Sequence, residues 1–210
     1  MRFKMVKVRK RIKVIILITL ILCICLIAAL YINHTEEEKA QILKKTKERE
    51  EISLIVNRIS ENGINSKEVE AIANRLNEVF EYKLANQGML YASYCTEKGV
   101  DPYLAAAISI HESYRGASEE ITNYNNVGGM RYGGKPMKFD TIEAGIIKYI
   151  DNLADNYVSK GLDTPEKMQS KYAGSTSWAK NVNYFYNKIK DGTYKAGLPL
   201  NTKYAASIWY

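Results

Sequence analysis

The sequence is poor in histidine, which limits the metal and nucleophile chemistry that it can support. Two histidines occur among its 210 residues, His34 after an apolar run and His111 near the middle of the chain. The His111-Glu112 pair lacks the second histidine, four residues on, that a zinc-binding helix requires. A serine triad would likewise depend on His111 alone. We therefore predict no metal site and no cofactor, and we assign His111 to packing or hydrogen bonding.

Cysteine is also scarce, and its positions argue against disulfide bonds. Cys23 and Cys25 fall within an apolar run, which leaves Cys95 as the third and last cysteine. Cys95 lies near Leu90 and Tyr91 in the sequence, a neighbourhood typical of a small core residue rather than a reactive thiol. We therefore expect the protein to be stabilised by an apolar core and not by disulfides.

Acidic residues are absent from the first thirteen positions, which hold seven lysines and arginines. The whole chain has a formal net charge of +7, so the other residues contain 23 basic and 23 acidic side chains. A nucleic-acid-binding domain needs a surplus of basic residues on one face. The part of the chain after residue 13 has no such surplus, and we predict no nucleic-acid partner.

Charge is absent altogether from residues 14–32, VIILITLILCICLIAALYI. At about 1.5 Å per residue, a helix of this length approaches the roughly 30 Å of a bilayer's hydrocarbon core. We predict a transmembrane signal anchor in the lipid bilayer, with residues 1–13 as a cytoplasmic tail because basic residues favour that side. The rest of the chain is then extracytoplasmic. A cleaved signal peptide is the alternative, although no small-residue cleavage site precedes Tyr31.

Glycine and proline are absent from residues 33–61, in which Glu and Lys dominate. This composition predicts a long charged helix that acts as a stalk. Apolar residues such as Ile42, Ile52 and Ile59 form a partial stripe along it. The stripe leaves open a dimer formed by two stalks.

Residues 62–190 carry helical patterns separated by short breaks, which predicts a mainly α domain. Periodic apolar residues predict helices over about 66–80, 82–98 and 102–112, and further helices that begin near 141, 165 and 178. Gly133 and Gly134, between short alternating segments, predict one small β-hairpin. The C-terminal tail 191–210 is aromatic but has no period, so packing against the domain and ligand binding both stay open for it.

Glu112 occupies an unusual place in the predicted helix that begins at Asp101 and Pro102. Leu104, Ile108 and Glu112 recur every fourth residue, so the carboxyl group shares a face with two apolar side chains. Partial burial and the negative end of the helix dipole both raise the pKa of such a carboxyl. A raised pKa suits the general acid of a glycoside hydrolase. The alternative is a glutamate that faces solvent at a frayed helix end.

The residues that follow resemble the catalytic signature of bacterial glucosaminidase-type peptidoglycan hydrolases. Residues 112–118 are ESYRGAS and residues 125–130 are NNVGGM, beside a family pattern of Glu-Ser-x-x-Gly-x-Ser and then Asn-Asn-x-x-Gly-Ile. The resemblance extends over about 80–189, roughly half of the chain. It implies a lysozyme-like α domain with a small hairpin, whose substrate is the glycan strand of peptidoglycan. It also implies Glu112 as the proton donor for cleavage after N-acetylglucosamine.

A second carboxyl group is missing from the place where the resemblance implies one. Many members of the family carry an acidic residue in the hairpin after Asn-Asn, but residues 131–138 contain none. We predict Asp140 as the second catalytic residue, with Glu119 and Glu120 as other candidates, and assistance from the substrate's own N-acetyl group as another route. Muramidase and lytic transglycosylase activities stay open, as does a non-catalytic protein that binds peptidoglycan or helps to assemble it.

Aromatic and amide side chains near the signature are the candidate sugar ligands. Aromatic rings offer an apolar face to a sugar, and an Asn pair binds either its own loop backbone or an acetamido group. The predicted substrate-binding residues are Ser113, Tyr114, Ser118, Tyr124, Asn125, Asn126, Tyr132, Tyr172 and Trp178, of which the last two rest on the resemblance.

Overall fold

The computed structural model describes residues 22–23, 25–27, 31–32, 34–47, 50, 53–55, 57–58, 61 and 67–197. The predicted tail 1–13, most of the predicted anchor 14–32, and residues 198–210 lie outside this set. The chain divides into two compact units, Met1–Glu50 and Glu51–Tyr210. The described residues of the first unit are helical. Across all the described residues, no helix combines the length and the apolar character needed to cross a bilayer.

The predicted stalk 33–61 is helical wherever the structure describes it, and its role as a stalk and its dimer stay predictions. Near the end of this segment, the Arg58 guanidinium donates to both carboxylate oxygens of Glu97, at 2.9 and 2.8 Å. This part of the predicted stalk therefore contacts the domain that follows it.

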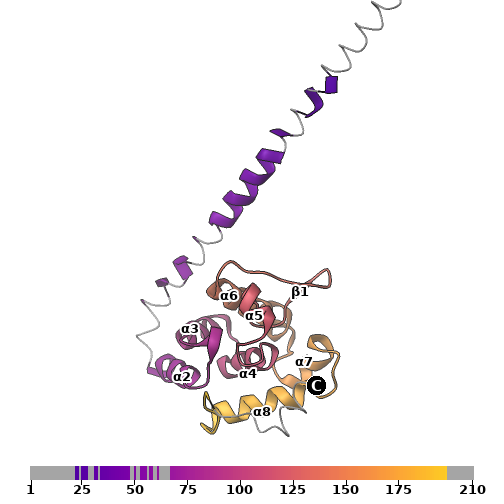
Figure 1. Ribbon diagram of the computed structural model, residues 1–210. Coiled ribbons are helices and arrows are strands. Elements are labelled where there is room, and N and C mark those ends of the chain that lie inside the picture. The colour runs from indigo at the N-terminus through magenta and orange to yellow at the C-terminus, as the bar shows by residue number, and fades with distance from the viewer. Residues whose placement is uncertain are drawn as a thin grey trace, which may run out of the picture. The chain divides into compact units, whose positions relative to one another are not determined.

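The second unit is mainly helical with one small antiparallel sheet, as the sequence predicts (Figure 1). In chain order its elements are α2 (Lys67–Asn77), η2 (Tyr82–Leu84), α3 (Gly88–Lys98), α4 (Pro102–Glu112), α5 (Glu119–Tyr124), β1 (Arg131–Tyr132), β2 (Lys135–Pro136), α6 (Ile142–Asn156), η3 (Val158–Lys160), α7 (Pro165–Tyr172) and α8 (Trp178–Lys190). The predicted helix over 82–98 is wrong in its first turns. Tyr82 and Asn86 have φ angles of 48° and 65°, which an α-helix does not contain.

Helix α4 forms the centre of the domain, and its sequence explains both its start and its burial. The Asp101 carboxylate accepts hydrogen bonds from the backbone N–H groups of Tyr103 and Leu104, at 2.8 and 3.3 Å. The seven residues from Leu104 to Ile110 are all buried, because α2, α3 and α8 pack around them (Figure 1). The side chains that follow Ile110 therefore emerge at the edge of the core.

Gly145 allows α6 to lie directly against the end of α5. A Cβ at this position would overlap the backbone carbonyl oxygen of Asn125, which ends α5 with a φ of 53°. We expect G145A to lower the free energy of unfolding by about 1–3 kcal/mol, the usual cost of overpacking, as measured by urea denaturation. G174A is the matched control, since nothing lies within 4 Å of a Cβ there. Equal stabilities for G145A and wild type would contradict the close contact.

Candidate active site

Glu112 ends α4 where the helix leaves the core, and its carboxyl group is enclosed by α8 and by the loop after α5. Its Oε1 accepts a hydrogen bond from the indole Nε1 of Trp178 at 2.7 Å. Its Oε2 lies 2.8 Å from the position of a Cβ built on Gly129, whose φ is 62°. Glycine at this position both permits the left-handed backbone and leaves room for the carboxyl group.

The surroundings of Glu112 favour its protonated form. Burial raises the pKa of the Glu112 carboxyl above its ordinary value of 4.5, the hydrogen bond from Trp178 opposes the rise, and the charge of Glu120 adds to it. The net direction is upward because a buried carboxylate loses the water that stabilises its charge. A carboxyl group with a raised pKa keeps its proton to higher pH and can donate it to a substrate oxygen.

Tyr172 and Trp178 form an aromatic wall beside this carboxyl group. Their rings stack with centroids 4.7 Å apart and an interplanar angle of 21°, and the Tyr157 ring lies 5.3 Å from that of Tyr172. The Tyr172 hydroxyl donates to the carbonyl oxygen of Gly128 at 2.8 Å. Trp178 is 2% exposed, so its indole orients the Glu112 carboxyl and does not offer a face to a ligand.

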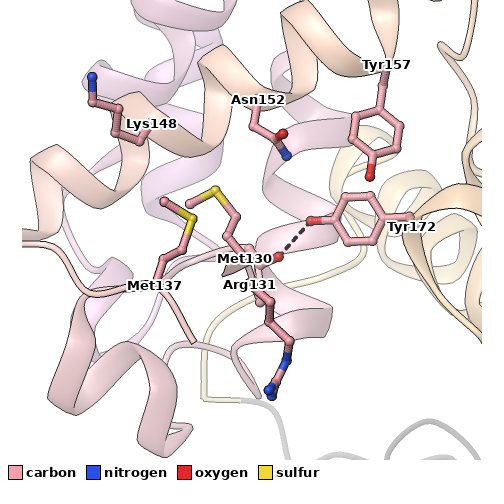
Figure 2. A pocket seen from close by; sticks show the side chains of 9 residues that line it. Met130, Arg131, Met137, Lys148, Asn152, Tyr157 and Tyr172 are labelled. Carbon is pink, nitrogen blue, oxygen red and sulfur yellow. Dashed lines mark hydrogen bonds between the residues drawn. The ribbon is translucent and has the colours of Figure 1, made fainter. Parts of the chain in front are cut away.

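A pocket of about 410 Å³ opens beside the aromatic wall (Figure 2). Its size falls within the roughly 300–1,000 Å³ of small-ligand sites. Figure 2 shows Tyr157 and Tyr172 at one end, Lys148 at the other, and Met130 between them. Gly129 belongs both to the pocket and to the surroundings of Glu112. The complete lining is Gly128, Gly129, Met130, Arg131, Met137, Lys148, Asn152, Tyr157 and Tyr172.

Two signature residues after Glu112 hold the backbone, Ser113 at the end of α4 and Asn126 at two residues of the pocket lining. The buried Ser113 hydroxyl donates to the carbonyl of Ser109 at 2.6 Å and accepts from the N–H of Gly116 at 2.8 Å. The Asn126 carboxamide makes three bonds across the base of the hairpin, to the N–H and carbonyl of Met130 and to the carbonyl of Met137, at 2.9, 2.8 and 3.2 Å. Asn126 therefore binds its own loop backbone, which is one of the two roles that the sequence allows for the Asn pair.

Asn125 has the same kind of role on the other side of the loop. Its Nδ2 donates to the carbonyl of Phe139 at 2.9 Å, and its Oδ1 accepts from Lys83 at 3.2 Å. Ser118 is the residue that precedes α5. Ser113 and the two asparagines therefore hold the backbone near Glu112, whereas the buried Ser118 hydroxyl has no hydrogen-bond partner within the described residues. Direct binding of a substrate by these four residues stays a prediction.

Of the predicted site residues in the described part of the chain, Tyr172 lines this pocket, and Glu112, Trp178 and the others do not. Tyr114 is 46% exposed and Tyr132, on the hairpin, is 84% exposed. The Lys138 ammonium stands over the ring of Tyr124, 4.3 Å from its centroid. Asp140 is exposed, two positions before α6. The structure thus brings Tyr172 and Trp178 to Glu112, whereas it places Tyr114, Tyr132 and Asp140 on the surface.

No protein-family model matches this sequence, and no curated protein matches it. Within the part of the chain that the structure describes, no group of three or more His, Cys, Asp or Glu residues is placed to hold a metal ion.

Several pocket residues carry no sequence signal that would have assigned them to a site. Lys148 and Asn152 are polar positions of an amphipathic helix, and Tyr157 follows the end of that helix. Arg131 binds Glu120 with an Nη2–Oε1 distance of 2.7 Å. The sequence offers a signal for this last pair, because Glu120 is a candidate for the second carboxyl group and the predicted hairpin follows it closely in the chain.

Proposed function

We propose that this chain hydrolyses β-1,4 bonds in the glycan strand of peptidoglycan, as a membrane-anchored endo-β-N-acetylglucosaminidase with a lysozyme-like domain. Glu112 is the general acid that protonates the glycosidic oxygen. The Trp178 N–H orients the Glu112 carboxyl and stabilises the carboxylate that remains after proton transfer. The glycan strand lies across the pocket beside Tyr172.

The observation that carries this proposal is the enclosure of Glu112 against Gly129, a residue that also lines the pocket. The carboxyl group is partly buried and its pKa is raised, and it stands between the indole of Trp178 and the bare backbone of Gly129. Buried carboxyl groups without an ion pair destabilise a fold, so their presence beside a pocket favours a chemical role. The resemblance of residues 112–130 to glucosaminidases supplies the substrate class.

A second carboxyl group usually activates water or stabilises the sugar cation in such enzymes, and we propose Glu120 for this role. Glu120 is close enough for its charge to raise the pKa of Glu112. The salt bridge to Arg131, a pocket residue, fixes its carboxylate at the hairpin. Neither Glu120 nor Asp140 lines the pocket. Asp140, the residue predicted from the sequence, is exposed and is not among the groups that raise the pKa of Glu112, and it stays the alternative.

The proposal also places the chain in a bacterial cell membrane, crossed once by residues 14–32. The support is the uncharged run of nineteen residues and the basic cluster that precedes it. In this arrangement the N-terminus is cytoplasmic, the charged helix 33–61 is a stalk, and the catalytic domain faces the wall.

Mass spectrometry of the products tests the activity. The full chain, purified in detergent, is incubated with peptidoglycan, and the released fragments are reduced with borohydride. Reduced N-acetylglucosamine ends, absent with E112Q, are the expected result. Reduced muramic ends or anhydro ends would replace the proposed activity by that of a muramidase or a lytic transglycosylase. The absence of fragments from folded wild type would favour a wall-binding protein.

Trp178→Phe is expected to raise the pKa of Glu112 further, because it removes the N–H that stabilises the carboxylate and keeps an aromatic ring. The protonated acid then persists to higher pH, so the alkaline limb of the kcat/KM profile shifts upward. Tyr184→Phe is a matched control, since Tyr184 lies on the same helix and does not line the pocket. An unmoved alkaline limb in W178F would show that Trp178 serves packing alone.

A further inference from the structure

One wall of the pocket comes from a single face of α6. Lys148 and Asn152 are four residues apart, so they lie one helical turn apart on the same side. Figure 2 shows Asn152 between Lys148 and the two tyrosines, with Met130 and Met137 facing this row. The pocket therefore has a cation at the end that lies away from the aromatic wall.

The cation at this end is not neutralised by the protein. Within the described part of the chain Lys148 forms no salt bridge, whereas Arg131 pairs with Glu120 and Lys98 pairs with Asp151, at 2.7 and 2.8 Å. Lys148 is also partly buried. A partly desolvated ammonium gains most from an anionic partner, and a charge-assisted hydrogen bond to a carboxylate is among the strongest it can form.

We infer that the pocket binds a carboxylate-bearing arm of the glycan strand, with Lys148 pairing with the carboxylate. This inference rests on the proposed function. The sugar ring lies at the tyrosine end, next to Glu112, and its arm runs past Met130 and Met137. Asn152 offers an amide for the polar groups of the arm, and the methionine side chains cover its apolar part. Lys148 is thus the residue that distinguishes an anionic glycan from a neutral one.

A carboxylate can come from two parts of a peptidoglycan strand. On a bare strand it belongs to the lactyl ether of the muramic ring, whereas on a substituted strand it belongs to the stem peptide. Oligomers of N-acetylglucosamine have neither group and carry no charge. These three glycans therefore separate recognition of a carboxylate from recognition of the sugar backbone.

The test compares kcat/KM for peptide-bearing strands, peptide-free strands and N-acetylglucosamine oligomers, with the full chain in detergent. K148Q is expected to lower kcat/KM about tenfold on an anionic strand and to leave the neutral oligomers unchanged. The kind of strand on which K148Q loses kcat/KM identifies the source of the carboxylate. K148R is expected to keep the preference, and K67Q, the same charge change on α2 outside the pocket, is the control.

An equal loss on the neutral oligomers, or an unchanged preference in K148Q, would overturn the inference. A K148R variant that behaves like K148Q would do the same, because charge is then not the feature that matters. Failure of the proposed hydrolysis is measured separately, by the absence of products with all three glycans. In that event the inference is tested by binding. Tryptophan fluorescence measures the affinities of E112Q and of E112Q/K148Q for the anionic and the neutral glycans, and the ratio of anionic to neutral affinity decides the inference.

Discussion

Replacing Glu112 with glutamine is expected to abolish most of the glycan cleavage while stabilising the fold. The loss of rate should be about 10²- to 10⁴-fold, the usual contribution of a general acid, because the amide keeps the shape of the side chain and has no transferable proton. The gain in stability arises because burial raises the pKa of Glu112, so the ionised side chain destabilises the folded state. Product release and urea denaturation measure the two effects.

The pH dependence of this stability difference has a definite sign. A folded-state pKa above the ordinary 4.5 means that the contribution of Glu112 is fully favourable below that pH and is lost as pH rises through the folded value. E112Q should therefore have a larger free energy of unfolding than wild type at pH 7, and the two values should be closer at pH 4. Burial lowers the pKa of His111 to about 4, but this contribution is common to both proteins. A less stable E112Q at pH 7 would contradict the buried acid.

Glu120→Gln is expected to lower the rate about 10²-fold or more, if Glu120 is the second carboxyl group. It should also move the alkaline limb of the pH profile to lower pH. The negative charge of Glu120 raises the pKa of Glu112, so its removal lets the acid lose its proton sooner. Product release from peptidoglycan, followed from pH 4 to pH 9, measures both effects.

Two variants make this experiment decisive. E119Q removes the same charge from the neighbouring, exposed position of α5 and is expected to leave the rate and the profile unchanged. D140N tests the residue predicted from the sequence. A large loss in D140N with normal activity in E120Q would make Asp140 the second carboxyl group, and normal activity in both would favour assistance from the substrate's N-acetyl group.

Local signals account for the parts of the fold that the sequence predicts well. Asp101 and Thr141 accept hydrogen bonds from backbone N–H groups two or three residues later, so a short stretch of sequence contains both partners. The start of α3 was misplaced for a related reason. Tyr82 and Asn86 adopt positive φ angles although neither is glycine. Between them, Leu84 is buried and the Lys83 N–H donates to the Gly116 carbonyl at 3.4 Å, which are contacts that the local sequence does not reveal.

The site depends on partners that are far apart in the chain. The Trp178 indole bonds a carboxyl group 66 residues before it, and the pocket joins α6, the hairpin and α7. No spacing rule connects such residues, so only the resemblance placed Tyr172 and Trp178 near Glu112. The Asn pair was ambiguous for another reason: an amide that braces a loop and an amide that binds a sugar look the same in sequence.

Gly129 has a consequence for how this site can change over generations. Any substitution there adds a Cβ 2.8 Å from the Glu112 carboxylate oxygen, on a backbone with a φ of 62°. Every missense mutation of a glycine codon introduces a side chain, so no single nucleotide change can alter this position without pushing against the acid. Natural variants that keep activity should therefore drift at Tyr114 or Tyr132 and stay fixed at Gly129.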